Sequence, residues 1–180
     1  EMFLLCSNLD SIVIPKGVKK IEMAMFDRCY NLKSVILPES ITELDTYAFI
    51  ECYSLSTITI PANVRKIGSM VFEDCRNLTS FYCCVEDPQE IEMGEDVFNR
   101  INEECILYVP QGCAQAYRGD ERWNAFSDIR EMGVTQVEPV SRQAAVPVEY
   151  YNLSGSKQTG LQQGINIIRY NDGKVRKVIQ

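Results

Sequence analysis

Cysteine is the residue type in this chain with the most capacity for chemistry, and histidine, its usual catalytic partner, is missing: the 180 residues contain eight cysteines and no histidine. A Ser-His-Asp triad, a Cys-His pair and a histidine-ligated metal site therefore cannot be built from this sequence. Cys83 and Cys84 are adjacent, and Cys105 and Cys113 are loosely spaced, so neither pair matches a metal-binding motif. We therefore expect a protein that is not an enzyme and that holds no metal or other cofactor.

Four of the cysteines occur at a constant step of 23 residues: Cys6, Cys29, Cys52 and Cys75. If the chain winds into stacked coils, equivalent residues lie about 4.8 Å apart, which leaves a disulfide between neighbouring coils open. A ladder of inward-facing thiols is the more common use of such a position, because free cysteine is among the most buried residue types. We therefore interpret the four cysteines as core residues.

Carboxylates are densest around Glu90, Glu92, Glu95 and Asp96. This group lacks the Asp-x-Asp-x-Asp-Gly order of a calcium-binding loop, so we expect a solvated acidic loop. A second candidate motif is the tripeptide Arg118, Gly119 and Asp120, which integrins recognise and which we expect in an exposed loop. Chance alone places this tripeptide in about 3% of chains of this composition, so it remains a candidate for partner binding only.

The step of 23 residues is shared by leucines, phenylalanines and prolines. The repeated positions are Leu9, Leu32, Leu55 and Leu78, then Phe3, Phe26, Phe49 and Phe72, then Pro15, Pro38 and Pro61. Inside each repeat, apolar residues alternate with polar or exposed ones, as Ile12 and Ile14 alternate with Ser11 and Val13, which is the pattern of a strand with one buried face. A fixed period of this length predicts a solenoid in which each coil is stabilised by its neighbours.

The strand motif Leu-x-x-Ile-x-Ile-Pro, the turn motif Ile-x-x-x-x-Phe and the closing Cys resemble the BspA-type leucine-rich repeat of bacterial surface proteins. The family turn is Ile-Gly-x-x-Ala-Phe; Ile67-Gly68 keeps its first half and Ala48-Phe49 its second, whereas residues 21–26 depart further. The resemblance covers residues 1–83. It implies a leucine-rich repeat solenoid of the right-handed β-α superhelix type, with 23-residue repeats, one parallel strand per coil, and short helical or 3₁₀ turns on the convex side.

The pattern loosens after residue 83 and recovers at residues 105–110. Pro110 follows Pro61 by 49 residues rather than 46, so we expect residues 84–110 to form a degenerate coil lengthened by three residues, with residues 86–90 as the inserted loop. Residues 111–133 then contain Trp123, Phe126 and Ile129 at spacings typical of a short amphipathic cap over the end of the core. The predicted repeat domain therefore spans residues 1–133.

The charge balance changes near residue 134. Residues 81–133 carry 12 acids and 4 bases, whereas residues 134–180 carry 3 acids and 6 bases. Residues 134–147 contain Pro139 and Pro147 and are expected to be a linker. Residues 148–180 are expected to form a small β-rich tail with strands over 148–153, 165–170 and 174–179, because Asn171-Asp172-Gly173 is a strong hairpin signal.

The tail resembles the C-terminal segments of exported proteins from the same bacterial group, some of which are sorting signals for an outer-membrane export route. This resemblance implies a secreted or cell-surface protein associated with the outer membrane. The chain opens inside a repeat, so we expect its natural start, and any signal sequence, further upstream. The net charge of −7 argues against nucleic-acid binding, and no apolar run approaches the roughly eighteen residues of a membrane helix.

The remaining candidate site is the outward side of the predicted strands. Its residues are Ser11, Val13, Ser34, Ile36, Thr57, Thr59, Ser80 and Tyr82. This nearly uncharged strip of hydroxyl and aliphatic groups offers hydrogen bonds without a strong field, which suits a protein or glycan partner; plain solvated sheet surface is the other interpretation. We therefore expect a non-enzymatic binding module in adhesion or host interaction, with a structural spacer or assembly element of a larger surface protein as the alternative.

Overall fold

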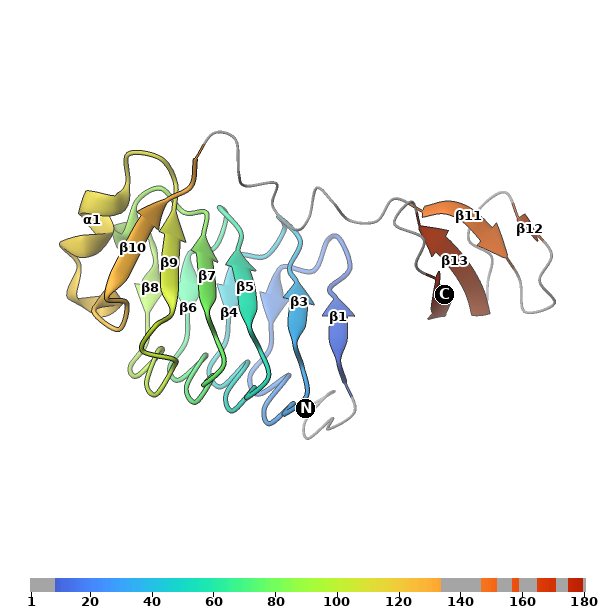
Figure 1. Ribbon diagram of the computed structural model, residues 1–180, viewed down its shortest axis with the longest axis horizontal. Coiled ribbons are helices and arrows are strands. Elements are labelled where there is room, and N and C mark those ends of the chain that lie inside the picture. The colour runs from blue at the N-terminus through green and yellow to red at the C-terminus, as the bar shows by residue number, and fades with distance from the viewer. Residues whose placement is uncertain (1–8, 134–146, 152–156, 159–164, 171–174, 180) are drawn as a thin grey trace. The chain divides into compact units, whose positions relative to one another are not determined.

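A computed structural model describes residues 9–133 and, further along the chain, the strand residues 147–151, 157–158, 165–170 and 175–179 (Figure 1). The chain divides into two compact units, residues 1–137 and 138–180. This division falls inside the predicted linker, and the exact domain boundaries stay predictions. Within the described residues no helix is long and apolar enough to cross a membrane.

The first unit is a parallel β-solenoid. One strand from each coil joins a six-stranded sheet in the order β1-β3-β5-β7-β9-β10 (Figure 1). The strands are β1 (Ser11–Val13), β3 (Ser34–Ile36), β5 (Thr57–Ile60), β7 (Ser80–Cys83), β9 (Ile106–Val109) and β10 (Asp128–Glu131). Ser11 pairs with Ser34, Ser34 with Thr57, and Thr57 with Ser80, so the sequence period of 23 is the coil length. The predicted leucine-rich repeat solenoid is confirmed.

A second parallel sheet runs along the other side of the coils, in the order β2-β4-β6-β8. Its strands have two residues each: β2 (Lys20–Ile21), β4 (Glu43–Leu44), β6 (Lys66–Ile67) and β8 (Glu92–Met93). The segment after each of these strands, where short helical turns were expected, is a series of hydrogen-bonded turns. Two residues per coil have positive φ there, beginning with Ala24 (φ 53°) and Arg28 (φ 55°).

These turns carry two alternating kinds of backbone hydrogen bond. The N–H groups of Ala24, Phe26 and Arg28 donate to carbonyls of the next coil at 2.9 to 3.0 Å. The residues between them donate instead to the carbonyl three positions earlier, as Met25 does to Glu22 at 3.1 Å. The left-handed backbone costs energy for residues other than glycine, and the hydrogen bonds between neighbouring coils offset that cost. The conformation of these turns is therefore stabilised by the stacking of coils and not by the intrinsic backbone preference of their residues.

The core is built as ladders of identical residues. Phe26, Phe49, Phe72 and Phe98 stack in succession, with ring centroids 5.2, 5.6 and 6.0 Å apart. The cysteine ladder lies beside them: the Cys52 thiol donates to the Phe26 carbonyl at 3.2 Å, and Cys29, Cys52 and Cys75 are fully buried. The prediction of buried core cysteines is confirmed for these three. Cys6 lies outside the described residues.

The lengthened coil is confirmed by the register of both sheets. Thr57 pairs with Ser80 at a step of 23, whereas Ser80 pairs with Ile106 and Lys66 with Glu92 at a step of 26. The extra residues therefore enter between β7 and β8. This segment contains the 3₁₀ helix η1 (Pro88–Glu90), which the side chain of Asp87 caps by accepting from the N–H of Gln89 at 2.9 Å.

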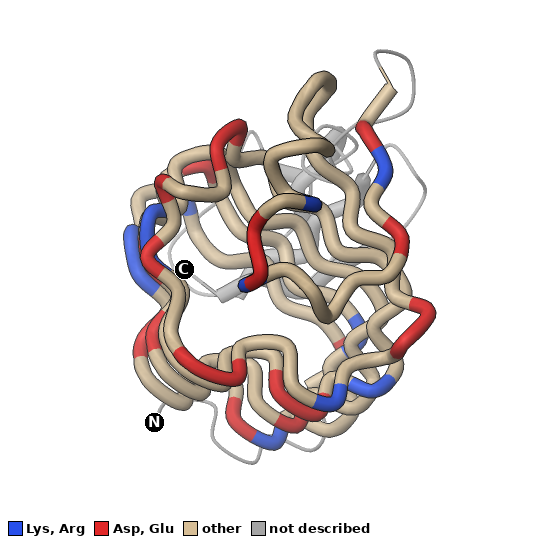
Figure 2. The backbone as a smooth tube through the Cα atoms, turned by 90° about the vertical axis from the view of Figure 1, so that its left-hand side faces the viewer, with Lys and Arg blue, Asp and Glu red and all other residues tan. Residues whose placement is uncertain are grey.

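The cap consists of α1 (Ala114–Arg118) and the 3₁₀ helix η2 (Glu121–Trp123). Trp123 is 1% exposed, and its ring centroid lies 5.3 Å from Phe98 and 4.9 Å from Tyr117, so it covers the core as predicted. Ile129, expected in the same amphipathic cap, lies instead in the sixth strand, β10, where it pairs with Leu107 of β9. Figure 2 shows the cap end, with charged residues concentrated on the outer turns.

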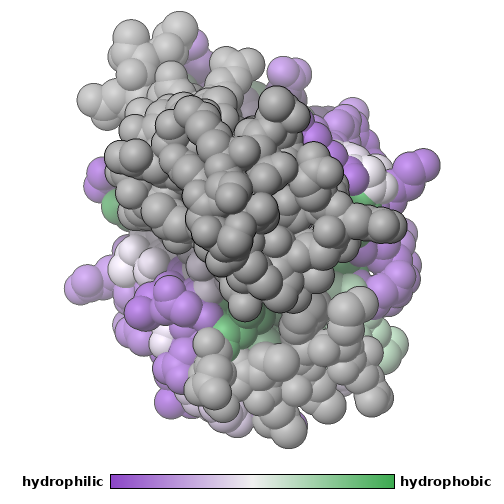
Figure 3. All heavy atoms as spheres, turned by 90° about the vertical axis from the view of Figure 1, so that its right-hand side faces the viewer, coloured by the Kyte–Doolittle hydropathy of each residue, from purple (hydrophilic) through white to green (hydrophobic). Residues whose placement is uncertain are grey.

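The opposite end of the solenoid begins with the first described coil. Its apolar residues are less buried than their equivalents further along: Leu9 and Ile12 are only half-buried, and Val13 is 50% exposed. Figure 3 shows hydrophobic side chains among hydrophilic ones on this side.

The second unit contains an antiparallel sheet in the order β12-β11-β13-β14. Its strands are β11 (Pro147–Tyr151), β12 (Lys157–Gln158), β13 (Ile165–Tyr170) and β14 (Val175–Ile179). β13 and β14 pair antiparallel, as the hairpin signal predicts, although residues 171–173 themselves lie outside the described residues. The two-residue strand β12 was not predicted.

Candidate functional site

The outward side chains of the six-stranded sheet form two rows, which we call the strand face. One row contains Ser11, Ser34, Thr57, Ser80, Ile106 and Asp128; the other contains Val13, Ile36, Thr59, Tyr82, Tyr108 and Arg130. The inward neighbours, such as Ile58, Phe81 and Leu107, are buried. All eight residues predicted for a concave binding face therefore lie on one side of one sheet. Their part in binding stays a prediction.

The two ends of the strand face differ in chemistry. The strands β1, β3 and β5 present only small hydroxyl and aliphatic side chains on this face, and Val13 is 50% exposed. The strands β7, β9 and β10 present an aromatic pair and a charged pair. The rings of Tyr82 and Tyr108 stack with centroids 4.6 Å apart and planes inclined by 12°. Arg130 donates from Nε and Nη2 to Oδ2 of Asp128 at 3.0 and 2.6 Å.

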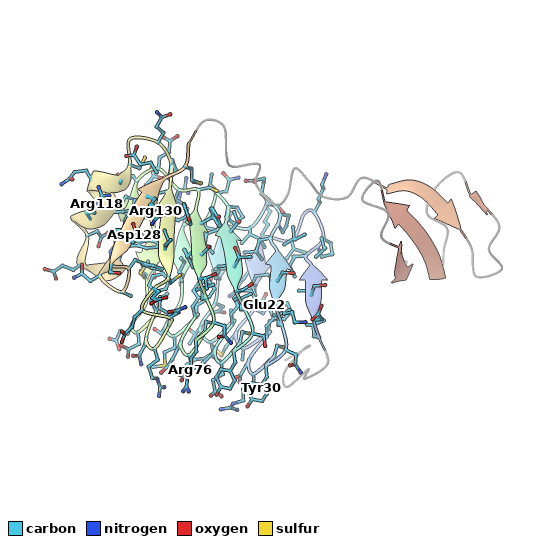
Figure 4. The ribbon with its side chains drawn as sticks, in the orientation of Figure 1. Glu22, Tyr30, Arg76, Arg118, Asp128 and Arg130 are labelled. Carbon is cyan, nitrogen blue, oxygen red and sulfur yellow. The ribbon has the colours of Figure 1, made fainter. Side chains whose placement is uncertain are left out.

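Arg130 follows Tyr82 and Tyr108 in the same row, one strand further along the sheet. It pairs with Tyr108 in the register of β9 and β10, and Figure 4 shows it beside Asp128 at the end of the sheet. The hydrogen bonds that Arg130 donates to Asp128 raise the pKa of Arg130, so the guanidinium keeps its charge. Burial, and next the neighbouring Tyr108, raise the pKa of Tyr82, so its hydroxyl stays protonated at neutral pH. This end of the strand face therefore combines a flat aromatic surface with the ion pair of Arg130 and Asp128.

Sequence reasoning missed four of these twelve residues. Ile106 and Tyr108 could have been found, because they alternate with the inward Leu107 and Val109 in a strand that was predicted. Asp128 and Arg130 were hidden because only Ile129 marks β10 as an apolar strand, and the other three residues of β10 are charged.

The tripeptide Arg118, Gly119 and Asp120 does not form the expected exposed loop. Asp120 is 6% exposed and is the N-cap of η2, where its carboxylate accepts from the N–H of Arg122 at 3.1 Å. The same carboxylate pairs with the Arg122 guanidinium and accepts from Nε2 of Gln89 at 3.0 Å. Arg122 lowers the pKa of Asp120 through these hydrogen bonds. The aspartate that an integrin would contact is thus occupied inside the domain, because the cap needs it.

Two of the acidic residues around the inserted loop form ion pairs between coils. Glu90 lies 3.2 Å from Arg65, and Glu92 lies 3.7 Å from Lys66. Among the described residues no group of three or more His, Cys, Asp or Glu side chains is placed to hold a metal ion.

A second aromatic row lies on the turns that lead into the strands. The rings of Tyr30 and Tyr53 stack at 5.0 Å, and the Arg76 guanidinium lies 5.5 Å from the Tyr53 ring centroid. Figure 4 shows Tyr30 and Arg76 on the turns below the sheet. We call this feature the turn row. It was not predicted, although its members also follow the step of 23.

The repeat itself decides the family. A family model described as "BspA type Leucine rich repeat region" matches residues 1–112 in six copies, which is more than half of the chain. The chain belongs to the BspA-type leucine-rich repeat family. Solenoids of this class are typically interaction or structural modules whose extended surfaces bind partners, and the strand face is the extended surface of this BspA-type domain.

A solved structure has a similar fold. The chain is similar to the leucine-rich repeat protein TpLRR of T. pallidum, with 22% identity and a TM-score of 0.55, over 73% of this chain and 64% of that one. The chain therefore spans less than two thirds of the length of TpLRR. A leucine-rich cell surface protein from Faecalibacterium prausnitzii A2-165 is 17% identical over 72% of this chain and 62% of that one, with a TM-score of 0.28. No curated protein matches the chain.

Proposed function

We propose that this BspA-type domain is a non-enzymatic binding module that takes a protein partner on its strand face, in adhesion or host interaction at the bacterial surface. The observation that carries the proposal is the stacked pair Tyr82 and Tyr108 beside the ion pair of Arg130 and Asp128. Tyrosine and arginine are the residue types that most often dominate the binding energy of protein interfaces.

The strand face is suited to binding a partner. A stacked tyrosine has little rotamer freedom left to lose, so a partner that packs on it meets a small entropy cost. The remaining rows of serine, threonine and aliphatic side chains continue this contact across the sheet, and six strands span about 24 Å. A flat partner surface can thus rest on the uncharged half while an acidic group meets Arg130.

The proposed surface location is supported by the family, which is named for bacterial surface proteins, and by the resemblance of residues 148–180 to export tails. A glycan partner uses the same tyrosines by stacking a sugar ring on them, and the binding experiment includes it. The spacer alternative uses none of these side chains.

The test is binding of the full chain to a panel of host matrix proteins and glycans, followed by substitution of the tyrosine and arginine side chains. Tyr108→Ala and Arg130→Ala should each weaken binding to the partner at least about tenfold, which corresponds to about 1.4 kcal/mol. Tyr53→Ala, which removes a stacked tyrosine from the turn row, is the matched control and should change binding less than about twofold.

Two results contradict the proposal. Binding that survives Tyr108→Ala and Arg130→Ala but is lost in Tyr53→Ala moves the site to the turn row. If the folded chain binds no member of the panel, the result favours the alternative that the domain is a structural spacer.

A further inference from the structure

The two sheets of the solenoid do not end at the same coil. The six-stranded sheet continues past β9 to β10, whereas the second sheet ends at β8. Strand β8 and the turn that follows it, residues 92–100, therefore face the space that a further coil would fill. We call this feature the β8 edge.

In earlier coils the equivalent segment is fully engaged with the next coil. The N–H groups that donate across are those of Ala24, Phe26, Arg28, Tyr47, Phe49, Glu51, Met70, Phe72 and Asp74, at 2.8 to 3.0 Å. The equivalent groups of the last coil belong to Asp96, Phe98 and Arg100. None of these three N–H groups has an acceptor in the part of the chain that the structure describes. The β8 edge thus carries a row of three unused donors.

The edge also offers one acceptor. The carbonyl of Ile67 accepts from the N–H of Gly94 at 2.8 Å, and the equivalent carbonyl one coil later is that of Met93. Among the described residues nothing donates to the Met93 carbonyl. A segment that stacks on this edge therefore needs one N–H followed by three carbonyls at alternate residues, the pattern that every earlier coil presents.

The cap covers only part of this end. Arg122 takes the place of a further coil at the Ile91 carbonyl, to which its Nη1 donates at 2.7 Å, and its Nη2 donates to the Pro88 carbonyl at 2.9 Å. The cap rings also cover the core side of Phe98, whose centroid lies 4.8 Å from that of Phe126. Between the cap and the edge remains a cavity of about 400 Å³, lined by Met93, Gly94, Asp96, Phe98, Arg122 and Ala125 among others.

Charges of alternating sign on successive strands of the second sheet indicate which residue type would pair with Glu92. Lys20 lies 3.4 Å from Glu43, Glu43 lies 3.9 Å from Lys66, and Lys66 lies 3.7 Å from Glu92. Glu92 ends the series, and its side chain is 75% exposed. Opposite charges on facing strand positions attract, so the position beyond Glu92 favours a lysine or arginine.

We propose that the β8 edge binds a peptide segment of about eight residues from another protein, led by a basic residue, which adds one strand to the second sheet. The leading base pairs with Glu92. The third residue donates its N–H to the Met93 carbonyl, and the carbonyls of the fourth, sixth and eighth residues accept from Asp96, Phe98 and Arg100. A small side chain at the seventh position enters the cavity beside Ala125, because the space of a larger one is taken by the cap. Addition of a strand to an open sheet edge is a common mode of peptide recognition.

The chain itself supplies the probe. Residues 66–73 stack on residues 43–50 in the register that the proposal requires, with Lys66 paired to Glu43. The probe is an acetylated and amidated octapeptide with this sequence and Phe72→Ala, added to the full chain. In the free chain, the amide hydrogens of Asp96, Phe98 and Arg100 should exchange about 100-fold faster than those of Met70, Phe72 and Asp74, measured residue by residue by NMR. The probe should slow all three.

Two pairs of variants test the contacts. Ala125→Trp fills the cavity and should weaken the probe at least tenfold, whereas Ala116→Trp, at an exposed position of α1 outside the cavity, should leave it unchanged. Glu92→Lys should lower the affinity for the probe about threefold. A probe that carries Lys66→Glu should bind the Glu92→Lys chain with the affinity that the first probe has for wild type.

Three results overturn the proposal. The first is no binding of either probe at millimolar concentration. The second is binding that protects amides elsewhere than at Asp96, Phe98 and Arg100. The third is protection of these amides in the free chain: if it rises with protein concentration, a second copy occupies the edge, and if it does not, another segment of this chain does.

Discussion

The hydroxyl group of Tyr117, in the cap, donates a hydrogen bond to the repeats. Removing this hydroxyl gives a quantitative test of the structure. Tyr117 is fully buried, and its Oη donates to the Val85 carbonyl at 2.7 Å and lies 3.2 Å from Sγ of Cys83. Tyr117→Phe keeps the ring that packs on Trp123 and deletes only the hydroxyl. No other described residue donates to the Val85 carbonyl, so the variant leaves that acceptor buried without a partner.

The cost follows from the chemistry of that acceptor. A buried polar group that loses its partner costs about 1–3 kcal/mol, because water cannot replace the lost donor. Tyr53→Phe is the control: its hydroxyl also donates, to Glu51 at 2.8 Å, but on the turn row, where water replaces it. We expect the control to stay within about 0.5 kcal/mol of wild type.

Urea denaturation, followed by the fluorescence of the single tryptophan, measures both variants. Trp123 lies 4.9 Å from the Tyr117 ring and therefore reports on the cap. Equal slopes of free energy against urea show that the same transition is compared. A loss for Tyr117→Phe no larger than that for Tyr53→Phe would refute the assignment of this hydrogen bond.

The pH dependence of the same variant is an independent check. Burial raises the pKa of Tyr117, so the folded state keeps the proton, whereas a tyrosine in the unfolded chain ionises near pH 10. A raised folded pKa gives stability that is complete below the unfolded pKa and lost as pH rises above it. The advantage of wild type over Tyr117→Phe should thus be constant from pH 6 to 9 and shrink by about 1.4 kcal/mol per pH unit above pH 10. An advantage that is unchanged at pH 11 contradicts the buried hydroxyl.

Three further predictions test the stacking of the coils. In Gly68→Ala, the new Cβ would lie 2.5 Å from the backbone N of Thr46, so urea denaturation should show a loss of about 1–3 kcal/mol, while Gly133→Ala, with open space around it, should show almost none. In a Cys6→Ser background, a maleimide at pH 7 should label only Cys84 and Cys113 in the native chain, because the other thiols are buried; labelling of more than two sites by mass spectrometry contradicts this. Burial raises the pKa of Asp27, so its ionised form is disfavoured in the folded state. Asp27→Asn should therefore stabilise the chain at pH 7 but not below about pH 3.9. A variant that is less stable than wild type at pH 7 would contradict this prediction.

The period of 23 residues predicts most of the fold because each coil repeats the environment of the one before it. Once Leu32 and Cys29 are placed in the core, the residues at steps of 23 from them are placed there too. The position of Pro110, three residues later than the period predicts, locates the inserted residues. The same logic predicts eight residues of the strand face. It does not reach the second sheet, because strands of two residues are too short to show alternation.

Features that depend on contacts across the array were not predictable from local pattern. Ala24 and Arg28 adopt positive φ without the glycine that usually signals it, because hydrogen bonds between neighbouring coils hold the turns that contain them. Asp120 is buried because Arg122 and Gln89 meet it, and neither partner can be inferred from the tripeptide alone. The strand face at Arg130 depends likewise on β10, whose single inward side chain is Ile129.

The corner between β7 and β8 absorbs a change of coil length by itself. The three additional residues there leave Phe81 paired with Leu107 and Tyr82 with Tyr108, so the strands on both sides keep their spacing. Pro88 anchors the loop in the core while Glu86, Gln89 and Glu90 are exposed. This corner is accordingly the place where the domain can carry a grafted loop, such as an epitope or a second recognition sequence, and still present its sheet unchanged.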